Sequence, residues 1–441
     1  MKEKNGKAGN PLCHIVTVGT TPTTSGDDVV AALVQDIGPL GVGRVVVIAT
    51  ADSVENAKRL LAGLGAKGPR GKIREIASAQ SLDDAFQAVG EEIETLRRAG
   101  VPSSDMILHY TAGTKVMSAG AVLAAMNNDV RSLRYLYSPG PRKTSVPVIT
   151  PTGSVMAEKD FRLALELFRA MRFQAVTDLI AALDSEGLTA QQAENRAVLA
   201  ELAEAYLDWD RFRVREFLKR YRSVEARLAK LPALWPFRVK PAVLESLEAI
   251  GAASECDGNY PAELLMDLLN NALRRLAERR PDDALIRLHR AAELFAQSCL
   301  QSDFGIRTDD LDIRKVPPRY RTAFEAERRI DDAMIKLGLR KSYELLEVLG
   351  HPAGKAYRDH ERLQEVLDER RNLVLAHGTR PATLRLAVDF LREVQGLLAL
   401  GIKDLKRRMA AQQFPWIDNA DILAPLTKAK QPPRKKRAGQ G

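Results

Sequence analysis

The sequence predicts two kinds of fold in one chain: an open, mostly parallel α/β domain first, and an all-helical architecture after it. Up to about residue 150, short apolar runs alternate with helical stretches, which is the pattern of a parallel sheet covered on both faces. Beyond that point apolar residues recur at spacings of three and four, as they do in core-facing helices. A chain of 441 residues is also too long for one ordinary core, so we expect two or three domains.

The first domain is predicted to span residues 1–155. Its strands are expected at residues 14–18, 44–48, 72–76, 105–109, 133–137 and 146–150. Its helices are expected near residues 27–37, 53–64, 82–98 and 114–126. In such sheets ligands bind beyond the carboxyl ends of the strands, so the loops after the first and fourth strands are candidate binding sites.

Both loops have the composition of a phosphate site. Gly19, Thr20 and Thr21 follow the first strand, and Thr111-Ala112-Gly113-Thr114-Lys115 follows the fourth and opens a helix. Small hydroxylated residues and Gly at a helix N-terminus expose backbone N–H groups to an anion, and Lys115 adds a full charge. Neither loop has the spacing of a Walker A or a dinucleotide fingerprint. Thr114 as a simple helix cap and Lys115 as a solvated side chain remain an alternative.

Residues 156–252 are predicted to form a helical connector. Helices are expected at residues 161–170, 173–183, 191–207 and 212–228, with no fixed repeat period. The aromatic residues near the third and fourth helices suit core packing better than stacking on bases. They are Tyr206, Trp209, Phe212 and Phe217. A Pro-containing break at residues 231–236 precedes the last domain, a helical bundle predicted over residues 253–415.

Near the end of that bundle, Arg370-Arg371-Asn372 is followed by three apolar residues and then by His377-Gly378. RNA cleavage without a metal needs a base, an acid and fixed positive charge on the phosphate. His377 titrates in the useful range and Arg371 offers a charged fork for phosphate oxygens, while Asn372 could orient either one. Taken alone, the motif is also compatible with a solvated helix end.

The spacing of the motif leaves the arginine open. Six steps place Arg371 about 240° from His377 around an unbroken helix, whereas seven steps bring Arg370 within about 20° of it. Either Arg370 is the partner, or the helix is distorted before His377, or the two residues act across a dimer. Gly378 and Pro381 favour an irregular end. We predict Arg371, Asn372 and His377 as the catalytic residues, with Arg370 as an auxiliary phosphate contact.

Two motifs resemble known families. Thr111-Ala112-Gly113-Thr114-Lys115 resembles the Thr-Gly-Gly-Thr-Lys loop of CARF domains, the cyclic-oligoadenylate sensors of type III CRISPR systems, with Ala112 where Gly is usual. The Arg371-Asn372…His377 stretch resembles the Arg-x(4 to 6)-His signature of HEPN ribonucleases. The chain is therefore similar to standalone CRISPR-associated CARF–HEPN effectors over nearly its full length.

This resemblance implies a Rossmann-like sensor, a helical connector and a HEPN-like bundle. It implies a homodimer that binds cyclic oligoadenylate across its sensors and then cleaves single-stranded RNA without a metal or cofactor, leaving 2′,3′-cyclic phosphates. The implied ligand-binding residues are Gly19, Thr20, Thr21, Thr111, Gly113, Thr114 and Lys115. A ligand-controlled RNA-binding regulator with an inert HEPN domain, and a ring nuclease acting in the sensor, are the two rival functions.

Composition and charge are compatible with this reading. The chain has 45% hydrophobic and 28% charged residues, no membrane-length apolar run and no N-terminal signal segment, so we expect a cytoplasmic protein. Three widely spaced cysteines indicate neither a disulfide framework nor a zinc site. The net charge of +9 suits a polyanionic partner. Residues 416–441 are predicted to be a disordered basic tail, either binding RNA loosely or only solubilising the chain.

Overall fold

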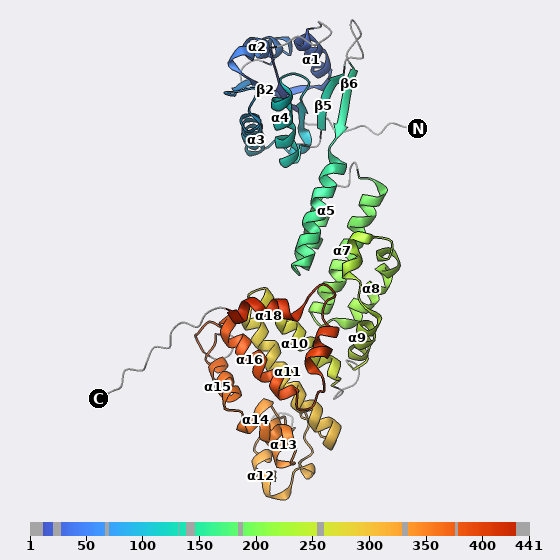
Figure 1. Ribbon diagram of the computed structural model, residues 1–441, viewed down its shortest axis with the longest axis vertical. Coiled ribbons are helices and arrows are strands. Elements are labelled where there is room, and N and C mark those ends of the chain that lie inside the picture. The colour runs from blue at the N-terminus through green and yellow to red at the C-terminus, as the bar shows by residue number, and fades with distance from the viewer. Residues whose placement is uncertain are drawn as a thin grey trace, which may run out of the picture. The chain divides into compact units, whose positions relative to one another are not determined.

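The computed structural model confirms the predicted fold class. It describes residues 12–20, 28–66, 70–130, 132–137, 146–183, 188–253, 260–328, 334–374 and 378–428. They form two compact units (Figure 1): the first holds residues up to 167 together with 179–197, and the second holds 168–178 together with residues from 198 onward. The first unit contains the sheet, and the second consists of helices and the turns between them.

The sheet has six strands in the order β3-β2-β1-β4-β5-β6 (Figure 1). Their bounds are β1 Leu12–Thr17, β2 Val42–Ala49, β3 Gly71–Glu75, β4 Met106–His109, β5 Ser132–Tyr137 and β6 Val146–Pro151. The first five are parallel, and β6 is antiparallel to β5. Because β1 pairs with both β2 and β4, the point where the strand order reverses lies between β1 and β4. Ligands of open α/β sheets bind at such a point.

Helices cover both faces of the sheet (Figure 1). Their bounds are α1 Val29–Ile37, α2 Val54–Gly63, α3 Leu82–Arg98 and α4 Lys115–Asn127. Successive side chains of a strand point to opposite faces, and β1 follows this rule: Ile15 packs with residues of α3 and α4, and Val16 packs with residues of α1 and α2. The predicted strands and helices are present, with ends shifted by a few residues.

The remaining helices follow one another from residue 153 onward. Their bounds are α5 Gly153–Arg169, α6 Phe173–Ala182, α7 Ala190–Asp210, α8 Val214–Leu228, α9 Pro241–Ala253, α10 Ala262–Ala277, α11 Pro281–Phe304, α12 Arg321–Glu325, α13 Leu339–Val348, α14 Pro352–Asp359, α15 Glu361–Arg371, α16 Leu384–Leu398, α17 Leu405–Ala411 and α18 Asn419–Lys428. Tyr206, Trp209 and Phe217 are fully buried, so their predicted packing role is confirmed. None of the described helices is long and apolar enough to cross a membrane.

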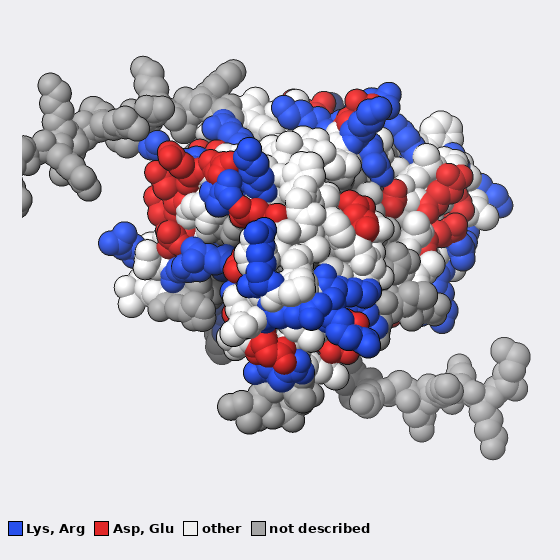
Figure 2. Space-filling model, turned by 90° about the horizontal axis from the view of Figure 1, so that it is seen from below, with Lys and Arg blue, Asp and Glu red and all other residues white. Residues whose placement is uncertain are grey.

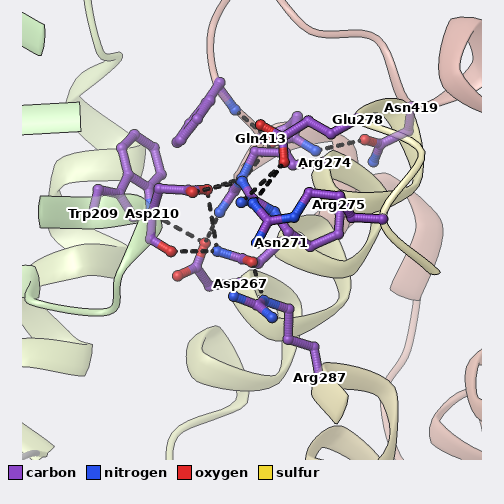
Figure 3. Close-up of polar contacts among 12 residues, drawn as sticks. Trp209, Asp210, Asp267, Asn271, Arg274, Arg275, Glu278, Arg287, Gln413 and Asn419 are labelled. Carbon is purple, nitrogen blue, oxygen red and sulfur yellow. Dashed lines mark hydrogen bonds and ion pairs between the residues drawn. The ribbon is translucent and has the colours of Figure 1, made fainter. Parts of the chain in front are cut away.

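A buried ionic network joins α7 to α10 inside the second unit (Figure 3). Arg274 is 0% exposed and contacts Asp210 at 3.0 Å and Asp267 at 3.4 Å. Arg275 contacts Asp210 at 2.6 Å and Glu278 at 3.0 Å. Charges withdrawn from water are tolerated only when they are paired and hydrogen-bonded, and each arginine here has two carboxylates. The network therefore fixes the end of α7 against α10.

The segment that precedes α18 belongs to the same core. Gln413 accepts a hydrogen bond from Arg274 at 2.8 Å, and the Trp416 ring packs against Phe414 and Phe168. The prediction of disorder from residue 416 is therefore wrong for residues 416–428, because it extended the basic, Pro-rich composition of the last residues back over an apolar segment. Residues 429–441 lie outside the described part of the chain.

Candidate functional site

The two predicted phosphate loops meet at the carboxyl ends of β1 and β4. A Cβ atom on Gly19 would lie 2.9 Å from the Gly113 Cα atom, so the loops touch through their backbones. Gly113 has a φ of 107°, a conformation that side chains disfavour. Thr20 is exposed next to this contact, and Thr21 lies outside the described residues. The loops thus share one surface at the point where the strand order reverses.

Hydrogen bonds to strands of the sheet fix the second loop. The Thr111 hydroxyl accepts a hydrogen bond from the Leu136 amide at 2.9 Å, and the Thr17 hydroxyl donates to the Ala112 carbonyl at 2.5 Å. The Ala112 methyl group is buried in the core shared by α1 and α2, which is a physical reason for Ala where the resembling loops have Gly. Thr111 therefore fixes the loop instead of presenting a free hydroxyl.

Thr114 and Lys115 differ in what they leave available. The Thr114 hydroxyl accepts from the Met117 amide at 3.1 Å and donates to the Ala79 carbonyl, so it caps α4. Lys115 is exposed at the first position of α4 and has no ion pair among the described residues. Its ammonium group and the N-terminus of α4 are both favourable to an anion.

Sequence reasoning missed two polar features beside these loops. Asn56 of α2 donates to the Gly19 carbonyl at 2.9 Å, and its position in an amphipathic helix gave no signal for this contact. Beneath the loops, His14 of β1 and His109 of β4 share a hydrogen bond of 2.9 Å and are both fully buried. Burial lowers the pKa of His14 to about 4 and the pKa of His109 to about 3. Both imidazoles are therefore neutral near pH 7 and support the sheet.

At the other candidate site, the helix that carries the Arg-Arg-Asn motif ends before it reaches residue 377. α15 ends at Arg371, and Asn372 is its C-cap, with its side chain donating to the Asp368 carbonyl at 3.2 Å. The angular argument that favoured Arg370 over Arg371 assumed a helix continuing to His377, so it does not apply. His377 itself lies outside the described residues.

The backbone on either side of residues 375–377 is fixed by hydrogen bonds. The Gly378 amide donates to the Leu373 carbonyl at 3.0 Å, and the Arg380 amide donates to the Asn372 carbonyl at 3.1 Å. A Cβ atom on Gly378 would lie 2.1 Å from the Asn372 carbonyl oxygen, so only Gly fits there. Gly378 and Arg380 therefore lie close to the end of α15.

The two arginines of the motif have different surroundings. The Arg371 side chain is 50% exposed and contacts Asp368 at 3.2 Å, an exposed ion pair of the kind that contributes little to stability. Arg370 is half-buried, and its side chain has no hydrogen bond or ion pair among the described residues. Both line a cavity of about 380 Å³, which is also lined by His289 and Glu293 of α11 and by Arg340 of α13.

His289, for which the sequence suggests packing or hydrogen bonding inside the bundle, is half-buried and lines this cavity. Its pKa is lowered to about 4, first by burial and then by the nearby Arg370 guanidinium. Glu293 contacts Arg290 at 2.7 Å. The signal that could have drawn attention to His289 was its place on α11, five residues before the apolar stretch at 294–296.

Charge is distributed without a dominant sign on the face of the molecule that Figure 2 draws. Figure 2 looks from the lower end of Figure 1 and shows Lys and Arg side chains interspersed with Asp and Glu. A polyanion would therefore be held here by a few local cations and not by one broad basic face. Within the described residues, no group of three or more His, Cys, Asp or Glu side chains could hold a metal ion.

Comparisons with known proteins agree with this architecture. A Csm6 HEPN domain model matches residues 254–400, and a Csm6 6H domain model matches residues 156–250. Enterococcus italicus Csm6 bound to cyclic hexa-2'-fluoro-hexa-dAMP is structurally similar with a TM-score of 0.54 and 14% sequence identity, over 95% of this chain and 98% of that one.

A second solved structure is more distant. Can2 from Sulfobacillus thermosulfidooxidans in complex with cyclic tetra-adenylate has 14% identity over 46% of this chain and 67% of that one, with a TM-score of 0.23, too low to carry an argument. No curated protein matches the chain. The two domain models together cover more than half of the 441 residues, and the Enterococcus structure shares the fold over nearly the whole length. The chain belongs to the Csm6 family of CARF–HEPN effectors.

Proposed function

We propose that this protein is a cyclic-oligoadenylate-activated endoribonuclease that cleaves single-stranded RNA without a metal in CRISPR antiviral defence. The observation that carries the proposal is the Arg371-Asn372…His377 motif at the end of α15, within the residues matched by the Csm6 HEPN model. The end of a helix with an exposed arginine and a nearby histidine has the groups that a metal-free phosphoryl transfer requires.

Each residue of the motif has a distinct role in the proposed reaction. His377 takes the proton of a ribose 2′-hydroxyl or protonates the leaving 5′-oxygen, and Arg371 stabilises the charge that builds on the phosphate. Asn372 orients these groups. The 2′-oxygen attacks the phosphorus on the 3′-oxygen of the same ribose, and the bond from this phosphorus to the 5′-oxygen of the next nucleotide breaks. The products therefore carry a 2′,3′-cyclic phosphate and a 5′-hydroxyl.

The sensor ligand is proposed from the loops of the first unit. The Enterococcus Csm6 structure contains a cyclic oligonucleotide, and we carry that ligand class to this chain. Gly19, Gly113 and the N-terminus of α4 offer backbone N–H groups to phosphates, and Lys115 supplies a charge. Thr20 and Thr21 complete the proposed contacts, while Thr111 and Thr114 shape the loop.

A homodimer is proposed because one nuclease motif does not supply both the acid and the base of the reaction. One motif supplies one histidine, whereas the reaction profits from a base and an acid on opposite sides of the phosphate. The edge hairpin also carries an exposed apolar face, formed by Tyr135, Tyr137, Val146 and Val148, which pair across β5 and β6. Such a patch is typical of an interaction surface. If Val148→Asp leaves the mass measured by sedimentation unchanged, this face is not the dimer interface.

Ligand control requires that the ligand bind the active arrangement more tightly than the resting one. We expect a coupling of about 1–3 kcal/mol between ligand and RNA cleavage. The decisive experiment is RNA cleavage by the full-length protein in EDTA with a panel of cyclic oligoadenylates. Cleavage that requires one member of the panel supports the proposal.

Two other outcomes assign the rival functions. Ligand binding with no cleavage of any RNA indicates a regulator with an inert HEPN domain. Loss of the ligand in the absence of RNA indicates a ring nuclease in the sensor, an activity that can coexist with RNA cleavage.

A further inference from the structure

The cavity between α11, α13 and α15 contains more charge than the proposed cleavage reaction uses. Most of its charged side chains already have partners. The pairs are Arg340 with Asp368 at 2.9 Å, Arg371 with Asp368 at 3.2 Å, Lys341 with Glu344 at 3.1 Å and with Glu327 at 3.7 Å, and Glu293 with Arg290 at 2.7 Å. These charges are therefore already matched by counter-charges.

Arg370 is different because it reaches the cavity without a counter-charge. It is half-buried, and burial lowers its pKa, yet an arginine stays protonated in proteins. Among the described residues its guanidinium group makes no hydrogen bond or ion pair. A partly desolvated guanidinium without a carboxylate is unfavourable on its own and gains when an anion with two oxygens binds.

His289 is the second polar group at the cavity that lacks a partner. It is half-buried, and its ring makes no hydrogen bond among the described residues. The charged groups that face it are Arg290 and Glu293 on its own helix and Arg370 and Arg371 on α15. With a pKa of about 4, its ring is neutral at ordinary pH, so one ring nitrogen can donate a hydrogen bond and the other can accept one.

The remaining wall suits a nucleotide. Leu339 and Leu367 line the cavity beside the charged groups, and they offer an apolar surface to a base. A volume of about 380 Å³ lies within the range of small-molecule sites. A phosphate group on Arg370, a ribose or base edge on His289 and a base against the leucines would use each unpartnered group once.

We propose that this cavity binds the RNA nucleotide that flanks the scissile phosphate, with Arg370 contacting its phosphate and His289 hydrogen-bonded to its ribose or base. The inference rests on the proposed function, since it takes RNA as the substrate. It assigns Arg370 and His289 to substrate binding, and leaves the charge stabilisation at the scissile phosphate to Arg371.

Binding is measured first without cleavage. The protein is full-length His377→Ala, the probe is a fluorescent single-stranded RNA of mixed sequence, and the readout is anisotropy. We expect Arg370→Gln to weaken the Kd about tenfold and to reduce the slope of log Kd against log salt by about 0.7, the value for one phosphate contact on a single strand. Arg370→Lys should keep the slope of log Kd against log salt. His289→Ala should weaken the Kd about fivefold and leave that slope unchanged.

The matched control is Arg407→Gln, because Arg407 is an exposed arginine on α17 whose partner Asp404 is also exposed. Its Kd and salt slope should equal those of the parent. Cleavage is measured in the protein that keeps His377. There Arg370→Gln should raise KM by the same factor as it raises Kd and should change kcat less than threefold.

An unchanged Kd in both Arg370→Gln and His289→Ala would overturn the inference. A fall in kcat at constant KM would also overturn it, because the two residues would then act in the chemical step. A wild-type protein that cleaves no RNA would refute the proposed function instead, while the binding data would still report on the cavity.

Discussion

Two pairs of adjacent arginines in the helical unit have opposite surroundings. Arg274 and Arg275 on α10 are buried and are surrounded by Asp210, Asp267 and Glu278. Arg370 and Arg371 on α15 share no buried carboxylate, since Arg371 has only an exposed ion pair and Arg370 has none among the described residues.

The same dipeptide is thus a structural element in one helix and a candidate anion site in the other. Tertiary partners decide which. Charges that stabilise the fold are matched inside it, and a cation left unmatched at a cavity is available to a ligand.

The largest expected difference between the two pairs concerns stability. Arg274→Ala leaves Asp210 and Asp267 buried without their guanidinium, so it should reduce the free energy of unfolding by about 3–5 kcal/mol. Arg371→Ala, made at an exposed site, should change it by no more than about 0.5 kcal/mol. Urea unfolding of both variants, followed by circular dichroism, measures the difference. Similar midpoints for the two variants would show that the contrast between the pairs is not energetic.

The contrast reverses when cleavage is measured. Arg371→Ala and His377→Ala should each reduce RNA cleavage about a hundredfold or more, because they remove charge stabilisation and acid–base chemistry. Ligand binding and the oligomeric state should stay as in the wild type. Arg407→Ala serves as the control for loss of one surface charge. Wild-type rates in either motif variant would remove the motif from the mechanism.

Histidines sharpen the same comparison between buried and available groups. The pKa values of His14 and His109 are lowered to about 4 and about 3 in the folded protein. Below the ordinary histidine pKa of about 6.5, the unfolded chain therefore binds more protons than the folded one. The free energy of unfolding should therefore be highest above about pH 6.5. It should fall as the pH decreases, by about 2 kcal/mol per histidine near pH 5.

Calorimetry of the wild type and His109→Gln over this pH range tests that expectation. The variant should show a shallower dependence of the transition temperature of the sheet unit on pH. An equal dependence in both proteins would mean that the buried pair does not titrate as its surroundings require.

The smallest expected effect concerns the sensor. Lys115→Ala should weaken binding of cyclic oligoadenylate roughly tenfold, because one charged contact to a phosphate is lost, and should leave the maximal cleavage rate unchanged. Lys58→Ala, at an exposed lysine of the same unit, is the matched control. Titration calorimetry that finds equal affinities for Lys115→Ala and Lys58→Ala would exclude Lys115 from the site.

Local patterns carried most of the fold from sequence alone. Alternating apolar runs located the strands, and their order placed the Gly19 and Gly113 loops at one edge, where the structure has them in contact. The burial of Trp209 also followed from its helical spacing.

Contacts between residues far apart in sequence could not be predicted in this way. Asp210 pairs with Arg274, His14 with His109 and Asn56 with Gly19, and no local pattern indicates such pairs. The cavity at Arg370 depends likewise on α11 and α13. The ordered helix α18 was missed because the packing of Trp416 outweighs the polar composition around it.

The most direct test of the account is the chemistry of the RNA ends made by the full-length protein in EDTA. With the activating cyclic oligoadenylate, the products should carry 2′,3′-cyclic phosphates, and they should be absent without the ligand and in His377→Ala. Products with a plain 3′-hydroxyl, or equal cleavage with and without the ligand, would contradict the assignment of a ligand-controlled, metal-free ribonuclease to the end of α15.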